Sequence, residues 1–181
     1  MKVLIVYADG FEDVEALATR DVLIRSGIEV FDATINENDE VLSSHKLHLK
    51  GLNRLSKTNL GDFSAIILPG GSRGVNNLLN SSLVLSTVRW FYEQNKLVCA
   101  ICAAPMVLSK AGLLKNKRFT CYPGCEVGLD GIYTGEEVVV LDRMITARSM
   151  LYSVPFGLAI IEKLIGKEVK ERIYKQIAGL K

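Results

Sequence analysis

Histidine is scarce in this sequence, which has only His45 and His48 among its 181 residues. A cysteine hydrolase needs a base beside its nucleophile, and histidine is the usual one. His45 falls in an expected hairpin at a sheet edge, and the residue after the best-placed cysteine, Cys102, is Ala103. We therefore expect His45 to be exposed to solvent or to a partner chain, and not to act as the base of a Cys–His dyad.

The sequence also lacks an excess of charge and any long apolar run. Its 22 basic and 20 acidic side chains give a net charge of +2 without a basic cluster, so nothing favours a nucleic-acid partner. The apolar run near the N-terminus has five or six residues, too few for a signal-peptide core or a membrane span. Segment 152–165 is interrupted by Pro155, Gly157, Glu162 and Lys163. We expect no membrane partner, a cytoplasmic protein, and mostly reduced cysteines.

What the chain does have is apolar material for one full core. Hydrophobic residues make up 49% and charged residues 23%, and the length suits a single domain over 1–181. Apolar strands alternate with amphipathic helices, which predicts a three-layer α/β/α sandwich with a mostly parallel sheet. The expected strands, helices and hairpins are strand Lys2–Tyr7, helix Phe11–Ser26, strand Ile28–Ile35, hairpin Val41–Leu49, strand Ser64–Leu68, helix Leu83–Gln94, a strand ending at Cys102, helix Ala103–Lys110, strand 118–121, hairpin 137–147, and helices Tyr152–Ile165 and Glu168–Ala178.

Cys102 lies where a short apolar strand turns abruptly into a helix, the arrangement of a nucleophile elbow. A helix N-terminus favours an anion, so a cysteine placed there is expected to have a lowered pKa and an available thiolate. The alternative is a buried structural cysteine, since free cysteines are among the most buried residues. This stretch alone leaves both interpretations open.

Three loops should meet Cys102 at the carboxyl edge of the sheet: Ala8–Glu15, Pro69–Gly74 and the elbow itself. Glu15 beside a thiolate would have a raised pKa and could donate a hydrogen bond to sulfur. The alternative is a solvated acid that stabilises its helix. The N–H groups of Gly70 and Gly71 could form an oxyanion hole, although Pro-Gly-Gly is also a common tight turn.

The other cysteines invite a zinc or redox interpretation at Cys99-x-x-Cys102 and Cys121-x-x-x-Cys125. Cys99 lies within an apolar strand, and strand positions three apart point to opposite faces. This disfavours both zinc and a thioredoxin-type disulfide, so we expect no metal. Cys121 or Cys125 could lie near Cys102, and the sequence leaves that open.

Together these motifs resemble the ThiJ/PfpI superfamily, in the branch of the Parkinson-associated protein, over nearly the whole chain. The matching segments, in chain order, are KVLIVYADGFEDVEA, SAIILPGG, VCAICAAP, FTCYP, ITARS and FGLAIIEKLIGKE. The resemblance implies a flavodoxin-like fold, a homodimer and no cofactor. It also implies that Cys102 is the reactive cysteine and that Glu15 is the protonated acid bonded to it.

Further site residues follow only from this resemblance. Gly70, Gly71 and the N–H of Ala103 match the anion-binding loop, and Tyr122 and Arg148 are candidate pocket residues. Arg25 matches an arginine near the dimer interface, and His45 falls where relatives often carry an arginine from the partner subunit.

The resemblance implies a cofactor-free glyoxalase or protein deglycase that acts on methylglyoxal-type aldehydes or on their protein adducts. The chain differs from other members of this branch at two places. Tyr122 replaces a histidine assigned to proton transfer, and the segment Ser149-Met150-Leu151 replaces Gly-Pro-Gly. Tyrosine is a poor base at neutral pH, since its pKa is about 10. The loss of this histidine, while Cys102, Glu15 and the glycines remain, suggests the alternative of a redox-sensing stress protein or chaperone with an oxidisable Cys102. The peptidase branch carries Cys-His at the elbow, so Ala103 disfavours a peptidase.

Overall fold

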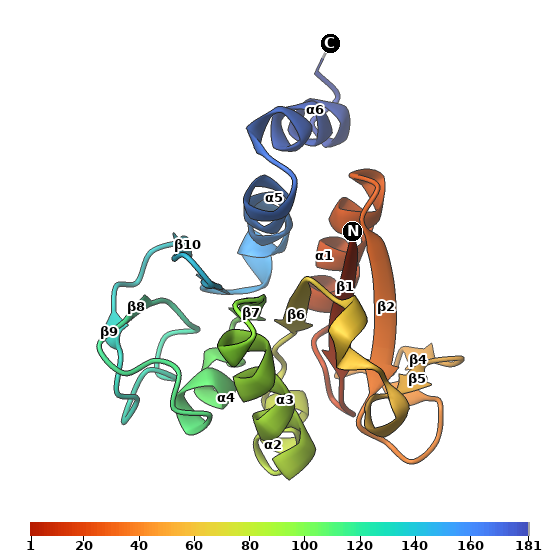
Figure 1. The fold of residues 1–181 in the computed structure, drawn as a ribbon, viewed down its shortest axis with the longest axis vertical. Helices are drawn as coiled ribbons and strands as arrows, with labels where there is room; N and C mark the ends of the chain where they lie inside the picture. Colours follow the sequence, from red (N-terminus) through yellow and green to blue (C-terminus); the bar gives the residue numbers. More distant parts are fainter. Residues whose placement is uncertain (181) are drawn as a thin grey trace.

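The computed structural model describes residues 1–180, and a seven-stranded sheet forms its centre (Figure 1). The strand order is β10-β11-β7-β6-β1-β2-β5, and every neighbouring pair is parallel except β10 with β11. The strands are β1 (Lys2–Tyr7), β2 (Glu29–Thr34), β5 (Asn53–Arg54), β6 (Ala65–Leu68), β7 (Leu97–Ile101), β10 (Val138–Val140) and β11 (Met144–Ala147). The expected mostly parallel sheet is confirmed.

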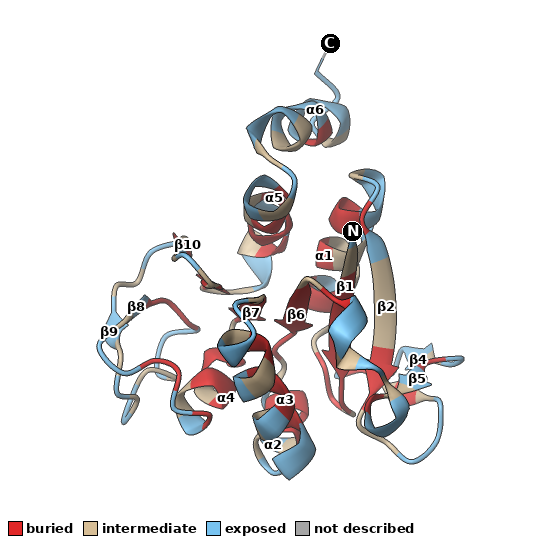
Figure 2. Cartoon of the chain, viewed as in Figure 1, coloured by how far each residue is buried: buried red, intermediate tan, exposed pale blue. Residues whose placement is uncertain are grey.

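The central strands are continuously apolar because both of their faces are covered. In β1, Leu4 and Val6 join one buried cluster, whereas Val3, Ile5 and Tyr7 join the other. Figure 2 shows these strands as buried, with the exposed residues on the outer helices and loops. The alternation of side chains along a strand therefore builds two cores from one sheet.

Helices cover both faces of the sheet and complete the three layers. One core takes its helical residues from α1 (Asp13–Arg25), α5 (Ser153–Leu164) and α6 (Lys167–Ile177). The other takes them from α2 (Ser72–Leu79), α3 (Ser82–Glu93) and α4 (Pro105–Lys110). Within α1 the buried face comprises Glu15, Ala16, Thr19, Val22 and Leu23.

The short elements lie at the margins. The expected hairpin over Val41–Leu49 forms as β3 (Val41–Leu42) and β4 (His48–Leu49), in a two-stranded sheet of its own. The expected strand over 118–121 is shorter, β8 (Arg118–Phe119), and it pairs with β9 (Ile132–Tyr133). Three 3₁₀ helices, Leu55–Lys57, Leu60–Asp62 and Met150–Tyr152, complete the secondary structure. The second hairpin, over 137–147, is confirmed as β10 and β11.

Two expectations about helices were wrong. The helix α2 was not predicted, and its first three residues were placed in the loop Pro69–Gly74; its eight residues include Gly74 and two asparagines, which are weak helix formers. The helix α4 begins at Pro105 and not at Ala103. Among residues 1–180, no helix combines the length and the apolar character needed to cross a membrane.

Candidate active site

The three loops expected at the carboxyl edge of the sheet do meet there. The N–H of Glu12 donates to the carbonyl of Gly70 at 3.0 Å, and the N–H of Gly74 donates to the carbonyl of Gly10 at 3.1 Å. These backbone bonds join the loop after β1 to the loop after β6. Glu15, in the first turn of α1, is thereby held against the elbow, the sharp turn at Cys102 between β7 and α4.

Cys102 adopts a left-handed backbone conformation with φ of 63°. This conformation is costly for a residue with a side chain, typically about 1–3 kcal/mol, and such residues cluster at functional sites. Its N–H donates to the carbonyl of Ala147 at 2.9 Å, which fixes the turn against β11. The N–H of Ala103 bonds to the Cys102 side chain, so one backbone donor already faces the sulfur.

Glu15 is almost completely buried, with 1% of its surface exposed. Its Oε2 accepts a hydrogen bond from the N–H of Gly70 at 2.8 Å, and its Oε1 is buried without a partner of good geometry. The pKa of Glu15 is raised to about 7, and burial is the largest cause. The charge of Glu12 also raises this pKa, whereas the hydrogen bonds with Cys102 and with the Gly70 N–H lower it. The expected raised pKa of Glu15 is supported, and a solvated role is excluded.

The pKa of the Cys102 thiol is raised, whereas the sequence led us to expect a lowered one. Burial is the largest cause, followed by the charge and the hydrogen bond of Glu15, and the Ala103 N–H opposes them only in part. The helix α4 starts three residues beyond Cys102, so the sulfur does not sit in its first turn. The resting side chain of Cys102 is therefore a neutral thiol, and the ionised form of Glu15 beside it can take the thiol proton.

Positions 70 and 71 require glycine because neighbouring atoms lie too close to leave room for a side chain. A Cβ on Gly70 would overlap Oε2 of Glu15 and lie 2.8 Å from Cβ of Cys102. Gly71 has φ of 92°, and a Cβ there would lie 2.7 Å from the backbone nitrogen of Glu12. Because Glu15 occupies the Gly70 N–H, an oxyanion at this site must share that donor. The oxyanion hole of Gly70, Gly71 and Ala103 stays a prediction.

The two candidate pocket residues differ in how they are held. Tyr122 is 51% exposed, and its N–H donates to the carbonyl of Cys102 at 2.8 Å, which places it beside the elbow. Arg148 donates to the carbonyl of Gly135 at 2.9 Å and also to the hydroxyl of Tyr152, over whose ring it stacks. Arg148 thus braces the loop before β10, and its place in a pocket stays a prediction.

The two candidate dimer residues are both exposed. Arg25 pairs with Asp21 one helical turn away at 2.6 Å. The His45 side chain is 75% exposed, as expected, and its Nδ1 lies 2.9 Å from Oδ2 of Asp13.

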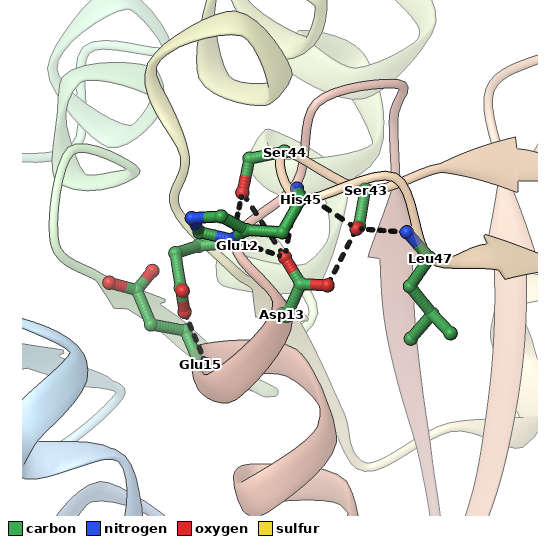
Figure 3. A network of polar contacts seen from close by, with 7 residues as sticks. All are labelled: Glu12, Asp13, Glu15, Ser43, Ser44, His45 and Leu47. Carbon is green, nitrogen blue, oxygen red and sulfur yellow. Dashed lines mark hydrogen bonds and ion pairs between the residues drawn. The ribbon is translucent and has the colours of Figure 1, made fainter.

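Asp13 ties the hairpin of β3 and β4 to the start of α1 (Figure 3). The hydroxyls of Ser43 and Ser44 donate to it at 2.6 and 3.2 Å, and the N–H of His45 donates at 3.3 Å. Burial opposes ionisation, but the bonds from Ser43, His45 and Ser44 lower the pKa of Asp13 overall. Figure 3 also shows that the carboxyl group of Glu15 points away from this network.

Within residues 1–180, one group of three side chains brings metal-ligating atoms close together: Glu12, Asp13 and His45. Their atoms lie within 4.8 Å of one another. Glu12 already caps α1 by accepting the N–H of Glu15 at 2.7 Å, and Asp13 is engaged by the hairpin. These bonds give the group a structural role without a metal.

None of the four cysteines belongs to that group, and all four are free thiols. Cys99 is fully buried and its pKa is raised by burial, so it is a core residue. The expectation that Cys99 and Cys102 point to opposite faces was wrong, since both pack against the same core. Strand alternation ends at Ile101, and the left-handed turn redirects the Cys102 side chain.

Comparison with known proteins now bears on this site. The family model described as the DJ-1/PfpI family matches residues 1–163. The chain belongs to this family. The dj-1beta protein of Drosophila melanogaster is 35% identical over 175 residues, which cover 95% of this chain and 94% of that protein. Its crystal structure has a TM-score of 0.91, with 98% and 97% of the two chains covered, and this confirms the flavodoxin-like fold.

Two further relatives of this DJ-1/PfpI chain differ in what their names describe. A protein named as a deglycase from Pyrococcus horikoshii is 32% identical, with 82% of this chain and 90% of that protein covered. The structure of a Toxoplasma gondii DJ-1, described as oxidized, is similar with a TM-score of 0.91 at 29% identity. The match covers 98% of this chain and 97% of that protein.

Several residues of the site were not found from the sequence. Glu12 caps α1, and its charge acts on Glu15. Asp13 bonds to Ser43, which lies in a hairpin thirty residues away. The E-D pair just before an apolar helix signalled a cap, but nothing local pointed to Ser43.

Proposed function

We propose that this protein is a cofactor-free glyoxalase or deglycase that acts on methylglyoxal-type α-oxoaldehydes or on their adducts with protein thiols and amines. The observation that carries the proposal is the buried pair of Glu15 and Cys102, with a carboxyl pKa of about 7 beside a thiol. A general acid–base group works best with a pKa near the operating pH. The deglycase name of one relative supports the same chemistry.

The first step is attack by the Cys102 sulfur on the aldehyde carbon. Since the resting thiol is neutral, Glu15 accepts the thiol proton as the carbon–sulfur bond forms. The new oxyanion takes hydrogen bonds from backbone N–H groups at Gly70, Gly71 and Ala103. The proton that Glu15 accepted then passes to this oxygen, which gives a hemithioacetal and leaves Glu15 ionised.

The second step moves a proton between the two carbons of the former aldehyde. Glu15 takes the proton from the carbon bonded to sulfur and returns it to the neighbouring carbon. The hydroxyl proton of the hemithioacetal moves to the oxygen of that neighbouring carbon, and the product is a thioester. Water then hydrolyses the thioester to lactate and frees Cys102, so methylglyoxal and water give lactic acid. Tyr122 orients the substrate and does not act as the base, since its pKa is too far above neutral.

A methylglyoxal-to-lactate assay tests this proposal. Cys102→Ser should abolish consumption, because a serine hydroxyl is far less acidic than a thiol. The Cys102→Ser variant should still bind the aldehyde but should not turn it over. Undiminished turnover in Cys102→Ser would contradict the proposal.

A second candidate function is a redox-responsive stress protein or chaperone, and one relative described as oxidized supports it. Here Cys102 is oxidised to a sulfinate that the protonated Glu15 and the Ala103 N–H stabilise. Mild peroxide followed by peptide mapping tests it. Earlier oxidation of Cys121 or Cys125, with Cys102 left reduced, would contradict it.

The proposed assembly is a homodimer through the outer face of α1. Val14 and Ile24 on this helix are 45% and 44% exposed, so they are available to a second copy of the chain. Arg25 is the last residue of the same helix, and His45 pairs with Asp13 at its first residue. Light scattering of wild type and Val14→Glu tests the interface, and the variant should have half the mass of the wild type.

The proposed compartment is the cytoplasm, which localisation of a tagged chain tests.

A further inference from the structure

Cys125 is fastened beside Cys102 by two backbone hydrogen bonds. The N–H of Tyr122 donates to the carbonyl of Cys102 at 2.8 Å, and the N–H of Cys125 donates to the carbonyl of Tyr122 at 2.9 Å. The second bond closes a tight turn over residues 122–125, and the first attaches this turn to the elbow. A charge on Cys125 also raises the pKa of Cys102, an effect that requires the two sulfurs to be near each other.

These two cysteines are also the accessible ones. Cys102 and Cys125 are partly exposed, whereas Cys99 and Cys121 are buried. A small oxidant such as hydrogen peroxide can therefore reach the Cys102–Cys125 side of the elbow before it reaches the other two thiols. Oxidation of a cysteine follows its thiolate character and its exposure. Ionised Glu15 can accept the proton of Cys102 and so give it thiolate character.

The turn that carries Cys125 has room to adjust. Tyr122, Pro123 and Gly124 are exposed, and a Cβ on Gly124 would have no atom within 4 Å. A disulfide needs its two Cα atoms about 4.4–6.8 Å apart. An exposed turn containing a glycine can shift to meet that requirement more easily than a strand within the sheet.

We propose that Cys125 is the resolving cysteine of Cys102, so that oxidation of this protein by hydrogen peroxide ends in a Cys102–Cys125 disulfide. In the first step the Cys102 sulfur attacks one peroxide oxygen, its proton passes to Glu15, and the oxygen–oxygen bond breaks. The sulfur loses two electrons and becomes a sulfenic acid, and the departing hydroxide takes a proton to become water.

In the second step the Cys125 sulfur attacks the Cys102 sulfur. The sulfur–sulfur bond forms as the sulfur–oxygen bond breaks, and the hydroxyl group leaves as water with the proton of the Cys125 thiol. The overall reaction turns two thiols and one peroxide into one disulfide and two waters. This competes directly with further oxidation of the sulfenic acid to a sulfinate, which thiols do not reverse.

The test uses the full-length reduced protein treated with a small excess of hydrogen peroxide. Unreacted thiols are blocked with N-ethylmaleimide, and intact mass and peptide mapping follow, with and without dithiothreitol. Wild type should lose the mass of two hydrogen atoms, lose two of its four alkylation sites, and yield a linked peptide pair containing Cys102 and Cys125. Dithiothreitol should restore both sites.

The variant Cys125→Ser and the matched control Cys121→Ala then separate the neighbouring thiols. Cys125→Ser should accumulate dithiothreitol-resistant sulfinate on Cys102 several-fold faster than wild type, whereas Cys121→Ala should still form the disulfide. Three results in wild type would overturn the proposal: sulfinate on Cys102 with Cys125 free, a Cys121–Cys125 disulfide, or no modification of Cys102. Since aldehyde turnover is measured on the reduced protein, its outcome is independent of this one.

Discussion

Glu15 and Gly70 are joined by a buried hydrogen bond of 2.8 Å between the Gly70 N–H and Oε2 of the carboxyl group. The bond links the first turn of α1 to the loop after β6, and it aims the rest of the carboxyl group at Cys102. It also explains why a glycine stands at position 70, since any side chain would occupy the space that Glu15 and Cys102 share.

Substitution Gly70→Ala should therefore disturb the pair directly. The new Cβ would overlap Glu15 and press on Cys102, and overpacking of this kind costs about 1–3 kcal/mol. We expect chemical denaturation to show that loss, together with a lowered kcat for methylglyoxal. Gly61→Ala is the matched control, because the nearest atom to its new Cβ lies at an ordinary 3.5 Å. Equal effects of the two substitutions would contradict this account of the loop.

Substitution Glu15→Gln should change how stability depends on pH. The folded pKa of Glu15 is about 7, above its ordinary 4.5, so the folded state binds the proton more tightly than the unfolded state. The stabilisation from this proton is complete below the ordinary pKa, falls as pH rises, and is lost above about 7. It amounts to about 3–4 kcal/mol at most, because the folded and ordinary pKa values differ by about 2.5 and each pKa unit corresponds to about 1.4 kcal/mol.

The measurement is urea denaturation of wild type and Glu15→Gln at several pH values between 4 and 8. The free energy of unfolding of wild type, relative to the variant, should decrease with increasing pH. A constant difference, or one that increases with pH, would show that Glu15 does not hold a proton in the folded protein.

Substitution of Ser43 should be much more harmful than substitution of its neighbour. Ser43 is buried, donates to Asp13 at 2.6 Å and accepts the N–H of Leu47 at 2.9 Å. Ser43→Ala should cost about 1–3 kcal/mol in thermal or chemical unfolding, because it leaves buried partners unpaired. Ser44→Ala, at an exposed position with a longer bond, should cost less than about 0.5 kcal/mol. The reverse order would disprove the anchoring role of Ser43.

Substitution Tyr122→His should raise the turnover of methylglyoxal. Tyr122 adjoins the elbow through its backbone and is half exposed, so a histidine fits there without repacking the core. Imidazole has an ordinary pKa near 6.5 and can exchange protons at neutral pH, which the phenol cannot. Tyr122→Phe is the control and should leave kcat within about twofold of wild type. An unchanged kcat in Tyr122→His would place residue 122 outside the reaction.

The sheet and its carboxyl edge could be predicted from sequence because both depend on local patterns. The apolar runs at β1, β6 and β7 show that they are covered on both faces, and the topology of parallel strands then brings Glu15, Gly70 and Cys102 together. The short elements could not be predicted, since α2 has weak helix formers and β5 has only two residues.

The electrostatics of the site also depended on contacts that the sequence does not display. The thiol pKa was expected to fall because a helix follows Cys102, but two residues separate Cys102 from α4 and a buried acid lies beside the sulfur. The left-handed backbone of Cys102 likewise left no local signal, since glycine is the residue that usually marks such a conformation.

The most direct test of the central claim is the conversion of methylglyoxal to lactate, followed by proton NMR in deuterated water, for wild type, Cys102→Ser and Glu15→Gln. If Cys102 forms the hemithioacetal and Glu15 moves the proton, wild type should produce lactate. Cys102→Ser should produce none, and Glu15→Gln should lose at least about a hundredfold in kcat, the usual scale for an acid–base group. Lactate formation at the wild-type rate in either variant would contradict the claim.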